Sequence, residues 1–152
     1  MMLAAMFLAV LFSDTENMSR SALDSQVDFD SQILPLLTRA GCNAGAFHGA
    51  AAGRGGFHLS LFGSEPQADY ASIVQFAEGR RVNLVDANKS LILARPLGQL
   101  DHGGDVVLEE NSPSEAILRR WLEEGAKRGS QRKLLQLRVD PFSTLVQAAR
   151  FA

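Results

Sequence analysis

The chain has 152 residues, of which 46% are hydrophobic and 21% are charged, with a formal net charge of −2. That length suits one globular domain, and the composition matches neither a disordered chain nor a membrane bundle. The net charge argues against a dedicated nucleic-acid binder, which needs a basic patch to engage phosphates. A single cysteine, Cys42, excludes an internal disulfide framework and a cysteine-rich zinc site.

The N-terminus carries an apolar run at residues 2–12, MLAAMFLAVLF, which a polar stretch follows at once. This run is too short to span a bilayer comfortably but matches the hydrophobic region of a signal peptide. We therefore expect residues 1–26 to be a signal segment and linker, and the protein to be exported to the periplasm or the cell surface. If the segment is not cleaved, residues 2–12 would associate with a membrane. The alternative is a frayed hydrophobic tail or a misplaced start.

A first helix is predicted directly after this linker. Asp28 or Asp30 can cap it, and Gly41 ends it. Its apolar positions are Ile33, Leu34, Leu36 and Leu37. A loop rich in glycine then occupies residues 41–56, and the alternation of apolar and polar side chains over residues 57–61 predicts a short extended segment.

A second helix is predicted from about Pro66 to Glu78, with Gly79 as its stop. A short helical turn over residues 90–94 ends before Pro96, and residues 98–111 read as loop.

The clearest helix comes last. Residues 112–115, Ser-Pro-Ser-Glu, form a capping box with proline at the first helical position. Gly125 terminates this helix, and its predicted buried face consists of Ile117, Leu118, Trp121 and Leu122. Residues 127–152 are expected to be a basic linker and the truncated start of a following domain, because residues 135–139 alternate like the beginning of a strand.

These elements predict a small all-α domain over residues 27–126, built from three or four short helices with long glycine-rich loops. Loops of that length usually serve a function or wrap a ligand. The apolar residues on the helices are also few for a domain of this size. A large apolar cofactor at the centre would account for both features.

The segment with chemical meaning is residues 41–49, GCNAGAFHG. A c-type haem is attached through two cysteines, and the histidine that binds iron directly follows the second. Here Cys42 and His48 are present, whereas Phe47 stands where the second cysteine would be. The motif is thus a C-x4-C-H pattern with one cysteine replaced.

This segment resembles the GCNxGxCHG pattern of the planctomycete-type cytochrome c domain family, the N-terminal haem region of large multidomain planctomycete proteins. Three further stretches are similar to the same family: residues 53–63, residues 90–96 with His102-Gly103-Gly104 downstream, and residues 118–126. The resemblance covers roughly residues 27–126, and it implies a small cytochrome c-like fold.

The resemblance implies that His48 is the proximal iron ligand and Cys42 the first thioether cysteine. No methionine follows Met18, so the second axial position goes to another residue or remains empty. His102, in the loop before the last helix, is the candidate for this position, with His58 as its rival. Two further residues would contact the haem, Phe47 at the porphyrin edge and Trp121 from the core.

The family resemblance implies an exported electron carrier that binds one c-type haem (heme c) and iron, is not an enzyme, and passes electrons to a redox partner protein. With Phe47 in the motif, attachment would be lost or reduced to a single link through Cys42. The alternative is a degenerate cytochrome c-like domain without haem, acting as a structural or interaction module. A third, weaker interpretation is a mononuclear metal site built from Cys42, His48 and a further histidine.

Overall fold

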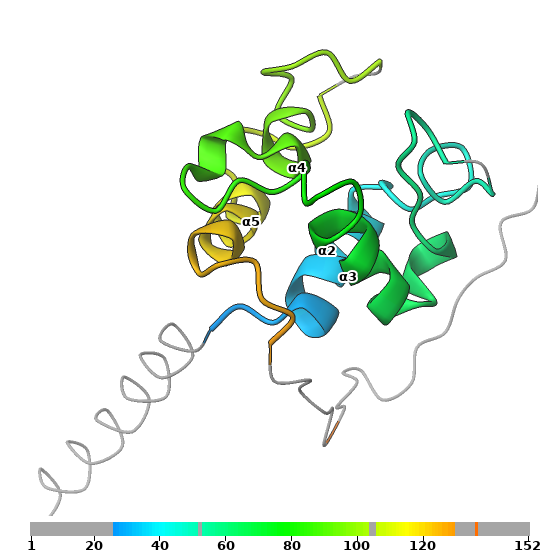
Figure 1. The fold of residues 1–152 in the computed structure, drawn as a ribbon, viewed down its shortest axis with the longest axis horizontal. Coiled ribbons are helices and arrows are strands. Elements are labelled where there is room, and N and C mark those ends of the chain that lie inside the picture. Colours follow the sequence, from blue (N-terminus) through cyan, green and yellow to red (C-terminus); the bar gives the residue numbers. More distant parts are fainter. Residues whose placement is uncertain (1–25, 52, 104–105, 130–135, 137–152) are drawn as a thin grey trace, which may run out of the picture.

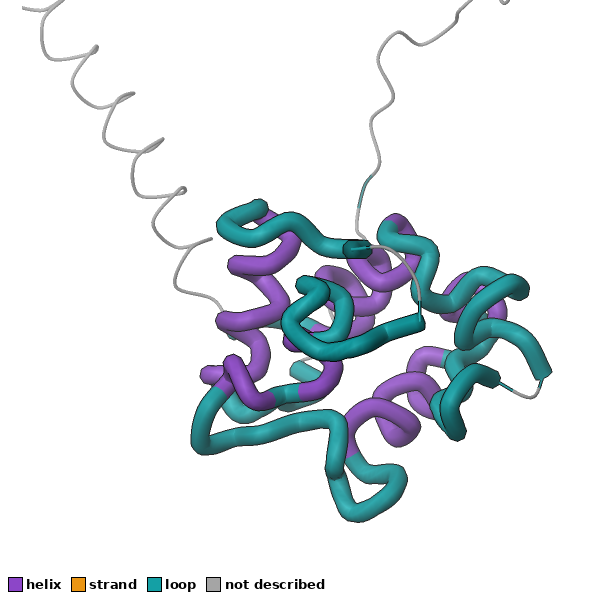
Figure 2. Tube along the Cα trace, turned by 90° about the horizontal axis from the view of Figure 1, so that it is seen from above, coloured by secondary structure: helices purple, strands orange, loops and turns teal. Residues whose placement is uncertain are grey.

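The computed structural model describes residues 26–51, 53–103, 106–129 and 136. Its α-helices are α2 (Leu34–Arg39), α3 (Pro66–Val74), α4 (Leu91–Ala94) and α5 (Pro113–Glu123). Three short turns of other helix types complete the elements: η1 (Phe29–Ile33), η2 (Leu61–Gly63) and η3 (Ala87–Lys89). No strand occurs among the described residues, and the predicted small all-α domain is confirmed (Figure 1). Figure 2 shows how much of the chain runs in loops between the short helices.

The first helical stretch begins where the sequence predicts. The Asp28 side chain accepts a hydrogen bond from Ser31 N at 2.8 Å, and a π-helical turn then runs directly into α2. Pro35 is the second residue of α2 and lies directly after this π-helical turn. Gly41 follows the end of α2 with φ +79°, a left-handed conformation that glycine adopts without strain.

The prediction that the second helix reaches Glu78 is wrong, because α3 ends at Val74. Beyond it, Ala77 and Glu78 both adopt positive φ, 54° and 58°. Phe76 N donates to the Ala71 carbonyl at 2.9 Å and not to the Ser72 carbonyl, which instead accepts from Arg81 Nη1 at 3.0 Å. Local periodicity does not reveal that contact.

The predicted extended segment at residues 57–61 forms no strand. Its pairing is limited to one antiparallel bridge between Arg54 and Phe57, and to a hydrogen bond from Leu59 N to the carbonyl oxygen of His48 at 2.9 Å. The turn η2 begins at Leu61. These contacts fold the glycine-rich loop back on itself.

Helix α5 agrees closely with its prediction. Ser112 Oγ accepts a hydrogen bond from Glu115 N at 3.2 Å, as a capping box requires, and Gly125 follows the helix with φ +91°. The predicted face is buried, completely so at Leu118, Trp121 and Leu122 and partly at Ile117.

The core forms where η1, α2 and α5 pack together, and aromatic rings fill its centre. The ring of Phe29 lies 5.3 Å from Tyr70 in an edge-on arrangement and 5.7 Å from Trp121. The polar groups of Tyr70 and Trp121 are both hydrogen-bonded. Tyr70 O–H donates to the Ala126 carbonyl at 3.0 Å, and Trp121 Nε1–H donates to the Lys127 carbonyl at 2.7 Å. The end of the domain is thereby tied to its beginning.

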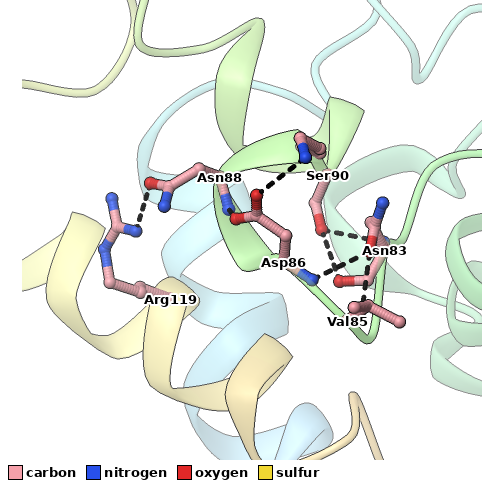
Figure 3. A network of polar contacts seen from close by, with 7 residues as sticks. Asn83, Val85, Asp86, Asn88, Ser90 and Arg119 are labelled. Carbon is pink, nitrogen blue, oxygen red and sulfur yellow. Dashed lines mark hydrogen bonds and ion pairs between the residues drawn. The ribbon is translucent and has the colours of Figure 1, made fainter.

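A polar network joins η3 and α4 to α5 (Figure 3). Asp86 caps η3, accepting from Asn88 N at 3.1 Å, while Asn83 N donates to Ser90 Oγ at 2.9 Å. Arg119 on α5 donates to Asn88 Oδ1 at 2.5 Å. This network fixes α4 beside α5, which matters because α4 forms one wall of the site described below.

The chain continues past residue 126 into contact with its own start. Arg128 pairs with Asp30, Nη2 to Oδ2 at 2.9 Å, and its carbonyl accepts from Phe29 N at 2.9 Å. The predicted signal segment at residues 2–12 lies outside the described residues, and so does the predicted strand at residues 135–139 except for Gln136. Within the described part of the chain, no helix has the length and apolar character needed to cross a membrane.

Candidate functional site

Three of the predicted site residues line one pocket between the glycine-rich loop, the turn after α3, α4 and the loop beyond it. The cavity measures about 100 Å³. Its walls combine two histidines, a thiol and four arginines with apolar side chains, namely Cys42, His48, Arg54, Gly55, Phe57, Arg80, Arg81, Leu91, Ile92, Arg95, Pro96 and His102. Groups that can bind a metal therefore share a small space with positive charge and an apolar surface, and no carboxylate is among these lining residues.

His48 is held in the pocket wall by Phe57. Its Nδ1 lies 3.1 Å from the Phe57 carbonyl oxygen, and the two ring centroids are 4.6 Å apart. When Nδ1 donates to this carbonyl, Nε2 carries the lone pair that a metal ion requires. Burial lowers the pKa of His48 below its ordinary value of 6.5, so the neutral, ligating form prevails at pH 7.

His102 faces the same pocket, with its ring centroid 6.0 Å from that of His48 and the two planes inclined by 31°. Metal–imidazole bonds are about 2 Å long, so two rings that bind one ion from opposite sides have centroids roughly 6 Å apart. His58 is exposed and lines a separate groove beside α3. The structure thus brings His102, and not His58, to His48.

Cys42 lies in the same wall as His48, and the backbone joins them. His48 N donates to the Cys42 carbonyl at 3.1 Å, and Cys42 N donates to the Leu37 carbonyl at the end of α2 at 3.0 Å. Burial raises the pKa of the Cys42 thiol to about 11, so it is protonated at pH 7. An unassisted thiolate reaction is therefore unfavourable there.

Two other residues of the segment 41–49 shape the loop that carries Cys42 and His48. Asn43 is fully buried, and its Nδ2 donates to Thr38 Oγ1 at 2.8 Å. A Cβ atom at Gly49 would lie 2.2 Å from the Asn43 carbonyl oxygen, so only glycine fits at that position. These residues position Cys42 and His48. The sequence motif alone does not show whether a residue has this positioning role or binds a ligand itself.

Arg81 is the principal site residue that the sequence analysis missed. Its side chain is only 8% exposed, Nη2 donates to the Gly56 carbonyl at 2.9 Å, and its guanidinium carbon lies 4.5 Å from the centroid of the Phe57 ring. Burial and the neighbouring Arg80 lower its pKa, yet a guanidinium remains charged at neutral pH. In the sequence, Arg80-Arg81 after Gly79 has the appearance of solvated surface, so no local pattern could have identified it.

Two residues predicted to contact a cofactor lie outside the pocket lining. Phe47 is 47% exposed although its neighbour His48 faces the cavity. Trp121 is fully buried in the aromatic core, with its indole N–H bonded to a backbone carbonyl. Cys42, His48 and His102 therefore line one pocket, whereas Phe47 and Trp121 lie outside its lining.

The chemistry of this donor set suits an iron porphyrin, since two imidazoles adjoin an apolar wall and a nearby thiol. The cavity of about 100 Å³ is small beside the roughly 300–1,000 Å³ of ordinary ligand pockets. The residues thus fit the group, but the walls must separate before a porphyrin can enter. Among the described residues, no three His, Cys, Asp or Glu side chains are grouped so that they could hold a metal ion.

Comparison of the chain with protein families, with curated proteins and with solved structures finds no match.

Proposed function

We propose that this chain is an exported electron-transfer domain, related to the planctomycete-type cytochromes c, that binds one haem between His48 and His102. The observation that carries the proposal is the 6.0 Å separation of these two imidazole rings across a partly apolar pocket. Paired imidazoles of this kind are an established ligand set for haem iron in electron carriers.

The chain's own residues have distinct tasks in this function. The Phe57 carbonyl orients His48 through Nδ1, which leaves Nε2 for the iron. Leu91 and Ile92 on α4 give the pocket an apolar wall that excludes water. When bound, the haem supplies one-electron chemistry, and two histidine ligands favour a lower reduction potential than a histidine–methionine pair. The protein catalyses no substrate reaction in this proposal.

Attachment of the haem depends on Cys42 alone. Phe47 cannot form a thioether, and its ring is partly exposed instead of lining the pocket. We therefore expect haem that is non-covalent or linked by one bond. Covalent attachment at two points requires a cysteine beside the ligand histidine.

A second candidate function is a degenerate domain that keeps the cytochrome c-like sequence as a structural or interaction module without haem. Two observations favour it: the phenylalanine in the attachment motif, and the cavity of about 100 Å³. In this case His48 and His102 would be polar lining residues with no metal to bind.

An absorption spectrum of the protein purified from an exporting, haem-competent host separates these functions. A Soret band that His48→Ala abolishes supports the haem proposal, and its survival or loss in acid–acetone extraction distinguishes covalent from non-covalent haem. Absence of the band, including after titration with hemin, contradicts the proposal and favours the degenerate module. Stoichiometric zinc without a Soret band would instead indicate the mononuclear metal site.

A further inference from the structure

Within the described part of the chain, the arginines around the pocket have no carboxylate partner. Near the end of the domain, Arg119, Arg120 and Arg128 each pair with a carboxylate, at 2.5, 2.6 and 2.9 Å. Among the described residues, no ion pair involves any of the four arginines that line the pocket, Arg54, Arg80, Arg81 and Arg95. These four guanidinium groups are therefore free of ion pairs with the carboxylates that the structure describes.

Arg81 shows that this charge is built into the site. Its guanidinium lies 4.5 Å from the ring centroid of Phe57 and 5.3 Å from that of Phe76. Nη1 and Nη2 donate to the backbone carbonyls of Ser72 and Gly56. These contacts fix the cation without neutralising it, and a buried charge with no counter-ion is costly. An anion in the pocket would offset that cost.

The remaining walls define the rest of the ligand. Leu91, Ile92 and Pro96 present apolar surface to the same cavity that the arginines line. A ligand that satisfies both kinds of wall has an apolar body and at least one acidic group, and arginine pairs with carboxylates through directed, charge-assisted hydrogen bonds.

We propose that the pocket recognises its ligand through carboxylates, with Arg80, Arg81 and Arg95 as their partners. The ligand class is an apolar, planar molecule with free carboxylates; on the function proposed above, it is a porphyrin whose two propionates are unesterified. Arg81 provides the fixed charge, whereas the exposed Arg80 and Arg95 supply mobile charges at the pocket rim.

The test compares hemin with its dimethyl ester, in which the carboxylates are blocked. The full chain is prepared as wild type and as an Arg80→Gln/Arg95→Gln double variant. Each protein is titrated with hemin and with the ester, and binding is followed by Soret absorbance. Both side chains are exposed, so the fold is retained. Arg39→Gln is the matched control, because Arg39 is exposed on α2 and does not line the pocket.

We expect wild type to bind hemin about tenfold more tightly than the ester, the factor typical of one charge-assisted hydrogen bond. In the double variant this preference should shrink through weaker hemin binding, because Arg81 alone then remains of the three proposed partners, while Arg39→Gln retains the full preference. Equal affinities for hemin and ester in wild type, or a preference as large in the double variant as in wild type, would overturn carboxylate recognition.

Metal-free protoporphyrin IX and His48→Ala separate this inference from the proposed function. If protoporphyrin IX binds in an arginine-dependent manner while His48→Ala leaves the hemin absorption spectrum unchanged, carboxylate recognition holds and iron ligation fails. If His48→Ala abolishes the hemin spectrum but ester and acid bind alike, iron ligation holds and carboxylate recognition fails. If neither porphyrin binds, both are refuted.

Discussion

Cys42 and His48 are coupled by the backbone hydrogen bond from His48 N to the Cys42 carbonyl, so the thiol and the imidazole share one rigid turn. Phe47 lies inside that turn, yet its side chain does not line the pocket that His48 faces. A phenylalanine at position 47 therefore leaves His48 facing the pocket. In the proposed function, the consequence of Phe47 falls on haem attachment.

Restoring the missing cysteine tests this conclusion. In an exporting host with cytochrome maturation, Phe47→Cys should increase the fraction of haem that survives acid–acetone extraction, because a second thioether becomes available beside His48. In-gel haem staining after denaturation measures that fraction, with Phe47→Ser as the control for loss of the ring. A wild-type signal as strong as that of Phe47→Cys would contradict the account.

The reactivity of Cys42 should report its burial. With a pKa of about 11 instead of 9.0, the folded thiol carries roughly 100-fold less thiolate at pH 8, partly offset by the greater nucleophilicity of a more basic thiolate. We expect iodoacetamide to alkylate the folded haem-free chain at least about tenfold more slowly than the urea-unfolded chain. The folded rate should continue to rise with pH toward about 11.

Since Cys42 is the single cysteine of the chain, mass spectrometry of the labelled protein follows this residue alone. Equal rates in the folded and unfolded states would show that the thiol is not buried in solution.

At the scale of elements, the sequence predicts best where the determinants are local. The start of α5 follows from Ser112 and Glu115, three residues apart, and the cap of the first helical stretch follows from Asp28. The end of α3 is predicted wrongly, and there the structure shows a contact from beyond the helix, in which Arg81 donates to the Ser72 carbonyl. Such a contact depends on tertiary structure and leaves no periodic signal.

The capping box offers a direct test of the α5 assignment. Ser112→Ala removes the side-chain acceptor for Glu115 N, and we expect the free energy of unfolding to fall by about 1 kcal/mol. Ser114→Ala is a matched control in the same turn, because Ser114 caps no backbone group in the described structure. Urea unfolding followed by Trp121 fluorescence measures both. Equal effects of the two substitutions would contradict the cap.

At the scale of the whole molecule, the sequence predicts the core better than it predicts the pocket. The all-α class and the buried residues of α5 follow from capping signals and 3.6-residue periodicity. The pocket draws its lining from the glycine-rich loop, the turn at Arg81, α4 and the loop with His102. Only the folded chain shows that these segments meet, and the family resemblance did not assign a role to the arginines.

The choice between His58 and His102 also depends on the fold. The family resemblance favours His102, in the loop before the last helix, and leaves His58 as its rival. In the structure His102 lies 6.0 Å from His48 across the pocket, whereas His58 is exposed beside α3. Three-dimensional proximity therefore assigns the second ligand in the proposed function.

Electron paramagnetic resonance of the ferric, hemin-loaded protein tests the proposed ligation most directly. We predict a low-spin signal of two imidazole ligands in wild type and in His58→Ala, because His58 lies outside the pocket. His102→Ala should convert it to a high-spin signal with one protein ligand, and His48→Ala should do the same or abolish binding. A low-spin signal that persists in His102→Ala, or one that His58→Ala removes, would contradict the account.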